Sequence, residues 1–179
     1  MIPWQLHLTA LDEGPEPWTC RERVDAVLAG EEVVHATANT AKDVCDDGHV
    51  HTDVSIGLLT TTRLIHVMAG DAQHVTEEHE LGLQCAVTSV PLSAITDVAV
   101  LSWDQLGTPA VEVRVSRPGA PWQALGGVHD CGDPHCDIPP GSIQLEARAE
   151  GVVLMAGGDD ARDLVRFAGH LARATGQRP

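Results

Sequence analysis

The sequence predicts a mostly β (α+β) domain, in which a bent antiparallel sheet of about seven strands forms a partly open barrel capped by one C-terminal helix. Short segments with alternating apolar and polar residues recur between residues 32 and 156, as is typical of half-buried strands. One strongly amphipathic segment follows them at residues 159–175. No strand–helix–strand alternation occurs, which disfavours a parallel sheet.

Composition and charge limit the classes of partner. Of the 179 residues, 43% are apolar, which is enough for a core and excludes disorder of the whole chain. Acidic residues outnumber basic ones by 26 to 11, and the formal net charge is −15. Because such a surface repels phosphate backbones and anionic head groups, we expect neither nucleic acid nor a membrane as partner. No signal peptide or membrane span is recognisable, so we expect a soluble cytoplasmic protein.

The N-terminal part predicts an arm and a short helix. Residues 1–19 contain several prolines and read as an extended arm with at most a short turn of structure. Thr19 is placed to cap a helix from Cys20 to about Ala29, and Gly30 is placed to end it. The apolar stripe of this helix consists of Val24, Val27 and Leu28.

The strands follow in order, and the clearest alternation is that of residues 111–116. Thr60, Thr61 and Thr62 connect two of the strands as a hairpin. Polar residues predict loops at 41–50 and 70–82 and an inserted loop at 126–142. We expect strands at 32–38, 52–59, 63–68, 83–92, 95–103, 111–116, 122–125 and 143–149, with 152–156 either extending the last of these or pairing separately.

The last element is a helix of about four turns that ends at Gly176. Asp159 or Asp160 is expected at its N-cap, where negative charge is favoured. The expected buried stripe consists of Ala161, Leu164, Val165, Ala168, Leu171, Ala172 and Thr175.

Three stretches resemble bacterial pleckstrin-homology-like proteins: the hairpin Leu58–Ile65 with its Thr-x-x-Arg-Leu turn, the Pro-Leu-x-x-Ile-x-x-Val turn at 91–98, and the closing helix. The two turns, together with Ala29-Gly30-Glu31 and the Cys-Gly-Asp-Pro-His-Cys element at 131–136, also resemble an uncharacterised actinobacterial family defined by a domain of unknown function. The resemblance implies one pleckstrin-homology-like domain over residues 20–179, with the Cys-containing loop inserted at 126–142. It implies no activity.

Cysteine and histidine form two clusters with the ligand types that zinc prefers. The first is Cys131, His135 and Cys136, in which a Gly-Asp-Pro turn allows the two sulfurs to converge. The second lies on the loop before the 52–59 strand. It consists of Cys45, His49 and His51.

The two clusters leave three interpretations open. Five cysteines without a secretion signal indicate reduced thiols or a metal site, not a disulfide framework. Zinc bound by both loops is one interpretation, and ordinary reduced thiols in tight turns are another. A thiol redox switch is weakened by Asp130 and Asp133, which would raise the pKa of the Cys131 thiol.

No complete catalytic set is recognisable in the sequence, so whether the protein is an enzyme stays undecided and a non-enzymatic module is favoured. The leading hypothesis is a binding or scaffold module for a protein partner, and an exposed sheet edge would also allow a homodimer. Trp103 and Trp122 flank the loop at 107–109, where an exposed Trp could anchor a partner or pack on the core. The alternative function is a metal-dependent, phosphodiesterase-like hydrolase that uses the Cys/His/Asp loop.

Overall fold

The computed structural model describes residues 4–9, 19–44, 50–71, 83–105, 107–118, 122–128, 143–149 and 151–177. None of the helices in these ranges is long and apolar enough to cross a membrane. In chain order the elements are α1 (Trp4–Thr9), α2 (Cys20–Leu28), β1 (His35–Val44), β2 (Val50–Leu59), β3 (Arg63–Asp71), β4 (Leu83–Pro91), the 3-10 turn η1 (Leu92–Ala94), β5 (Asp97–Gln105), β6 (Thr108–Ser116), β7 (Trp122–Val128), β8 (Ile143–Ala149), β9 (Val152–Gly157) and α3 (Asp159–Ala174).

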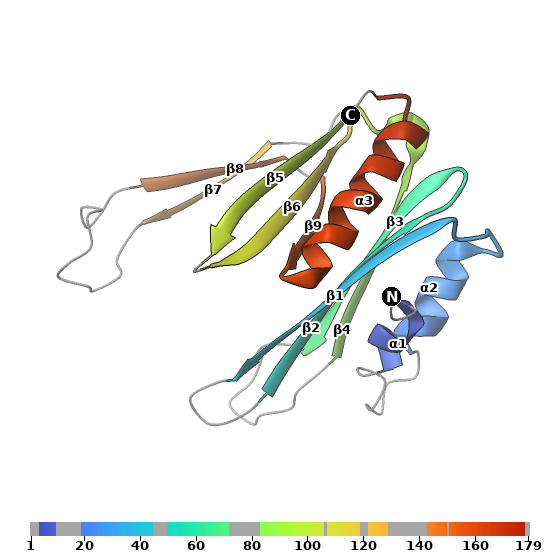
Figure 1. Cartoon of the computed structure of the whole chain (residues 1–179), viewed down its shortest axis with the longest axis horizontal. Helices are drawn as coiled ribbons and strands as arrows, with labels where there is room; N and C mark the ends of the chain where they lie inside the picture. Colours follow the sequence, from blue (N-terminus) through green and yellow to red (C-terminus); the bar gives the residue numbers. More distant parts are fainter. Residues whose placement is uncertain are drawn as a thin grey trace.

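The strands form separate antiparallel sheets, which confirms the predicted mostly β architecture with a C-terminal helix (Figure 1). One sheet has four strands in the order β1-β2-β3-β4, and the second has three in the order β5-β6-β9. β7 and β8 pair with each other in a hairpin of their own. Among the described strands no pairing joins the two larger sheets, so they do not close a barrel.

The predicted start of α2 is confirmed in atomic detail. The Thr19 hydroxyl accepts a hydrogen bond from the Glu22 backbone N–H at 3.1 Å. The Glu22 carboxylate accepts one from the Thr19 N–H at 2.9 Å, so both members of a capping box are present. The helix ends with Ala29 and Gly30 at positive φ, a conformation that costs glycine little.

The four-stranded sheet buries one face beneath the N-terminal helices. Val54, Ile56 and Leu58 share this face, because side chains alternate along a strand. They pack with Leu8 of α1 and with Val24 of α2. The segment 1–19, predicted as an arm, therefore contains a helix that covers part of the core.

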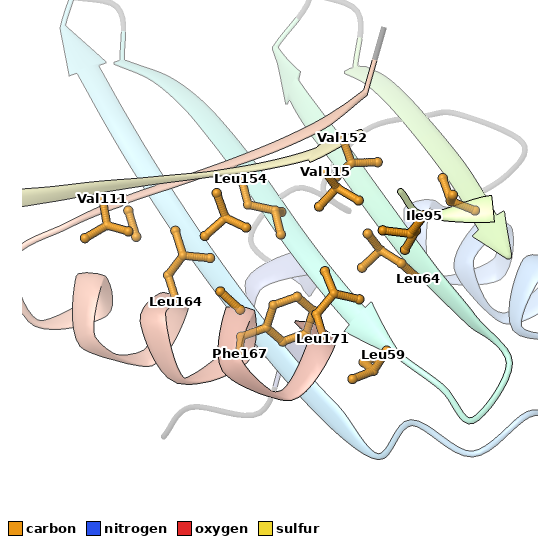
Figure 2. Packing of buried hydrophobic residues seen from close by; sticks show 14 of the residues in the cluster. Leu59, Leu64, Ile95, Val111, Val115, Val152, Leu154, Leu164, Phe167 and Leu171 are labelled. Carbon is orange, nitrogen blue, oxygen red and sulfur yellow. The ribbon is translucent and has the colours of Figure 1, made fainter. Parts of the chain in front are cut away.

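The opposite face of the four-stranded sheet packs against α3 and the three-stranded sheet. Figure 2 shows Phe167 and Leu171 of α3 beside Leu59 and Leu64 from the first sheet, and Leu164 beside Val111 and Leu154 from the second. Valines on alternate positions of β6 complete this cluster from the second sheet. The helix thus lies between the two sheets and holds them together (Figure 1).

Two expectations for α3 were wrong. Val165 was placed on the buried stripe but is exposed, and Phe167 is buried instead. The helix contacts strands of both sheets, and this determines which of its residues are covered. The N-cap residue is Gly158, at φ 60°, and Asp159 and Asp160 occupy the first turn. There they still favour the helix N-terminus electrostatically.

Several predicted boundaries were also wrong. The expected loops at 41–50 and 70–82 begin too early, because β1 runs to Val44 and β3 to Asp71. Polar side chains do not prevent pairing: Lys42 lies opposite Thr52, and Asp53 lies opposite Gly70. The expected insertion at 126–142 likewise starts inside β7, and its residues 129–142 lie outside the described residues.

The position of β9 decides the topology of the second sheet. The sequence left open whether residues 152–156 extend the preceding strand or pair separately. β9 pairs with β6, with Val115 opposite Val152 and Val113 opposite Leu154. The β7–β8 hairpin is therefore inserted between two strands that are neighbours in space.

Candidate protein-binding surface

The predicted metal ligands lie outside the part of the chain that can be examined for geometry. Five of them, Cys45, His49, Cys131, His135 and Cys136, fall outside the described residues. His51 lies in β2 opposite Asp43, but its side chain is not described. Within the described ranges no group of three or more His, Cys, Asp or Glu side chains is arranged to hold a metal ion.

The two cysteines whose side chains are described belong to the core beneath α1 and α2. Cys20 is buried at the start of α2, and Cys85 of β4 is half-buried against the same cluster. They pack as small apolar residues.

A Ser–His pair lies on the inner face of the four-stranded sheet. The Ser55 hydroxyl and His66 Nε2 are 3.3 Å apart. Burial lowers the pKa of His66 to about 4, so the ring is neutral at pH 7. Among the described residues no carboxylate contacts this ring. The pair is a satisfied polar contact within the core.

The outer face of the three-stranded sheet has a different character. Because β5, β6 and β9 are in register, Leu101, Glu112 and Met155 form one row across the sheet. Ala99, Arg114 and Val153 form the neighbouring row. The valines between these β6 positions point the other way, into the core with α3.

Four large apolar side chains remain partly exposed on this face. Leu101 is 38% exposed, Trp103 40%, Val153 40% and Met155 48%. Neither α1 nor α2 packs on this sheet, and α3 covers only the inner side (Figure 1). Large apolar side chains that gather on one exposed face mark interaction sites more often than scattered single ones do. We call this set of four residues, with Glu112 and Arg114, the outer-face patch.

An ion pair occupies the middle of the outer-face patch. Arg114 Nε donates to the Glu112 carboxylate, two positions earlier on the same strand. The Glu112 side chain is only 14% exposed, whereas that of Arg114 is 58% exposed. The Glu112 carboxylate therefore lies among apolar neighbours, whereas the guanidinium group of Arg114 remains accessible to solvent.

The sequence identified Trp103 as a possible anchor but missed the rest of the patch. Trp103 is partly exposed, while the Trp122 side chain lies outside the described residues. The unbroken apolar run at 152–156 was the available signal for Val153 and Met155, because such a strand has no polar face to present to water.

Arg63 has a structural role at the β2–β3 turn. Its Nη2 lies 2.6 Å from Glu31 Oε1 and donates to the Leu28 carbonyl at 3.2 Å. Thr62 donates to the same carboxylate at 2.8 Å. These contacts tie the end of α2 to the β2–β3 turn.

Comparison with known proteins adds no further identification: no family model, no curated protein and no solved structure matches the chain.

Proposed function

We propose that this protein is a non-enzymatic module that binds another protein through the outer-face patch. The observation that carries the proposal is the juxtaposition of Leu101, Trp103, Val153 and Met155 on a sheet face that no described helix covers. An exposed group of apolar side chains that includes a Trp has the composition of an interface core.

The charge of the chain defines the partner more closely. Asp97 and Asp104 are exposed at the two ends of β5, and Asp159 and Asp160 follow directly after β9. With a net charge of −15, the protein favours a partner whose apolar contact residues are bordered by Lys and Arg. The same charge disfavours self-association of the patch.

The proposal is tested with a photo-reactive benzoylphenylalanine at residue 155, in the cells that produce the protein. The matched control is the same substitution at Val165, which is 46% exposed on α3, compared with 48% for Met155. We expect a discrete cross-linked product from residue 155 only, and its loss when Trp103→Ser is added.

Once the partner is identified and purified, Trp103→Ser is expected to weaken its binding by about tenfold or more. A Trp that becomes buried in an interface is a typical hot spot. Val165→Ser is expected to leave the affinity within about twofold. Equal cross-linking from residues 155 and 165, or no loss with Trp103→Ser, would contradict the proposal.

The pleckstrin-homology-like assignment remains part of the proposal. It is supported by an antiparallel four-stranded sheet, an antiparallel three-stranded sheet and a closing C-terminal helix, once the β7–β8 hairpin is taken as an insertion. In that assignment the negative charge argues against the recognition of anionic lipids.

The zinc hypothesis is carried by the sequence alone. Elemental analysis of protein purified without added metal tests it directly. We expect about one ion per chain if the two Cys/His clusters converge, and loss of that ion in Cys131→Ser. A content well below one ion per chain would remove both the structural site and the alternative of a metal-dependent hydrolase.

A further inference from the structure

The β5 strand forms one edge of the three-stranded sheet, since its only strand partner in the described structure is β6. It is nine residues long, and an edge of that length presents several backbone groups for pairing. Two residues, Gln105 and Thr108, pair at the end of the β5–β6 hairpin, on either side of Gly107.

The direction of each backbone group along β5 follows from one contact. The Val98 N–H donates to Gln177 Oε1 at 3.0 Å and therefore points away from β6. Backbone groups alternate in an antiparallel ladder, so Val100 and Ser102 point away from β6 as well, whereas Ala99 and Leu101 point towards it. No hydrogen bond in the described structure uses the N–H of Val100 or Ser102.

The β4 edge of the four-stranded sheet is covered by neighbouring groups, in contrast to β5. There β4 packs against α2, and Arg23 Nη1 donates to the Cys85 carbonyl at 3.2 Å. On β5, Gln177 accepts a hydrogen bond from the Val98 N–H. Within the described part of the chain, no group pairs with the outward backbone N–H groups of Val100 and Ser102.

Apolar side chains border the open stretch on both faces of the sheet. Val100, on the face that carries the core, is 47% exposed. Leu101 and Trp103 border it on the outer face. A strand placed along this edge would therefore find apolar neighbours for both sets of its alternating side chains.

We infer that the partner adds an extended segment with Lys or Arg residues as a further strand on β5, pairing with the backbone of Val100 and Ser102. The inference rests on the proposed function, because the added strand would extend the sheet whose outer face carries the patch. Main-chain pairing supplies affinity in this mode, and neighbouring side chains supply specificity.

The basic character of the segment follows from charge complementarity. Asp97 and Asp104 lie at the two ends of β5, and both are exposed. A second copy of the chain would also carry a net charge of −15, and the repulsion between the two copies opposes β5–β5 pairing. A strand with Lys or Arg residues is instead attracted to Asp97 and Asp104.

The test uses a synthetic peptide that alternates valine and lysine over eight residues, and a matched peptide with glutamate for lysine. Amide exchange by NMR on the full chain is the first readout. In the free protein the amides of Val100 and Ser102 are expected to exchange faster than those of Ala99 and Leu101. The lysine peptide is expected to slow the exchange at Val100 and Ser102, and the glutamate peptide is not.

Ser102→Pro removes one outward N–H without touching the ladder to β6, because proline is tolerated where the N–H faces solvent. Ser102→Ala is the control that keeps the N–H. We expect the proline variant to weaken binding of the lysine peptide by about tenfold or more and the alanine variant by less than about twofold. Equal melting temperatures establish that both variants fold.

The outcomes separate this inference from the proposed function. If Trp103→Ser weakens binding of the cross-linked partner and Ser102→Pro does not, the patch binds a partner and strand addition is wrong. If neither substitution matters, both proposals fail. No protection by the lysine peptide at millimolar concentration, or a wild-type dimer that Ser102→Pro dissociates, also overturns the inference.

Discussion

The imidazole rings of His35 and His170 stack across the junction between β1 and α3, with their centroids 3.4 Å apart and their planes inclined by 25°. Arg173, one turn further along the helix, donates from Nη2 to His170 Nδ1 at 3.0 Å. Three groups that carry or can acquire positive charge therefore meet where the closing helix docks on the first sheet.

This junction is expected to weaken in acid. Loss of hydration, and then the charges of His35 and Arg173, hold the pKa of His170 below its ordinary value of 6.5. The folded state therefore binds a proton less readily than the unfolded state, so the stabilisation is present above about pH 6.5 and is lost as the pH falls. Urea unfolding between pH 7.5 and 5.5 should show a smaller loss of stability in His170→Gln than in the wild type. Parallel profiles would contradict this.

The buried His66 is expected to produce a larger pH effect than His170. Burial lowers its pKa from 6.5 to about 4, so stability is lost as the pH falls from 6.5 towards 4. Between pH 7.5 and 4.5 this amounts to roughly 2–3 kcal/mol of unfolding free energy. His66→Asn cannot titrate and should remove this part of the profile. Urea unfolding at each pH measures it, and an NMR titration that gives His66 a pKa near 6.5 would refute the assignment.

A single glycine sets the distance between α3 and the first sheet. A methyl group at Gly57 would lie 2.9 Å from Leu154 Cδ1 and 3.1 Å from Phe167 Cζ and Thr37 Cγ2. Gly57→Ala is therefore expected to cost about 1–3 kcal/mol, because three packed side chains must move. Gly157→Ala is the matched control in a strand: its nearest contact would be the Pro109 carbonyl oxygen at 3.9 Å, and its effect should stay within about 0.5 kcal/mol. Chemical unfolding of both variants measures the two changes in unfolding free energy, and equal changes would contradict the prediction.

The β7–β8 hairpin is expected to be dispensable for folding. β6 and β9 pair directly, with Val115 opposite Val152, so the strands on either side of the hairpin already lie together. Replacing residues 119–150 by a short Gly/Asn/Ser turn should shift the melting temperature by less than about 5 °C. Ending the chain at residue 158 is the control that should abolish cooperative melting, since it removes Phe167 and Leu171 from the core. Loss of cooperativity in the shortened hairpin variant would show that β7 and β8 belong to the folding unit.

Local patterns in the sequence predicted most of the elements and little of the surface that carries the proposed function. Thr19 and Glu22 identify the start of α2 because capping is a contact between near neighbours in the chain. Val54, Ile56 and Leu58 identify a strand face for a similar reason. The outer-face patch could not be assembled in this way, because Trp103 and Met155 come from β5 and β9.

The sequence by itself determined the antiparallel β architecture, the capped helix α2, the closing helix and the strongly negative charge, since each depends on composition or on residues a few positions apart. The tertiary structure decided which face each strand buries and placed β9 beside β6. It also left Val165 exposed, buried Phe167, and stacked His35 against His170. These outcomes depend on how two sheets and a helix share one core. Packing of that kind is a property of distant segments together, and no local periodicity records it.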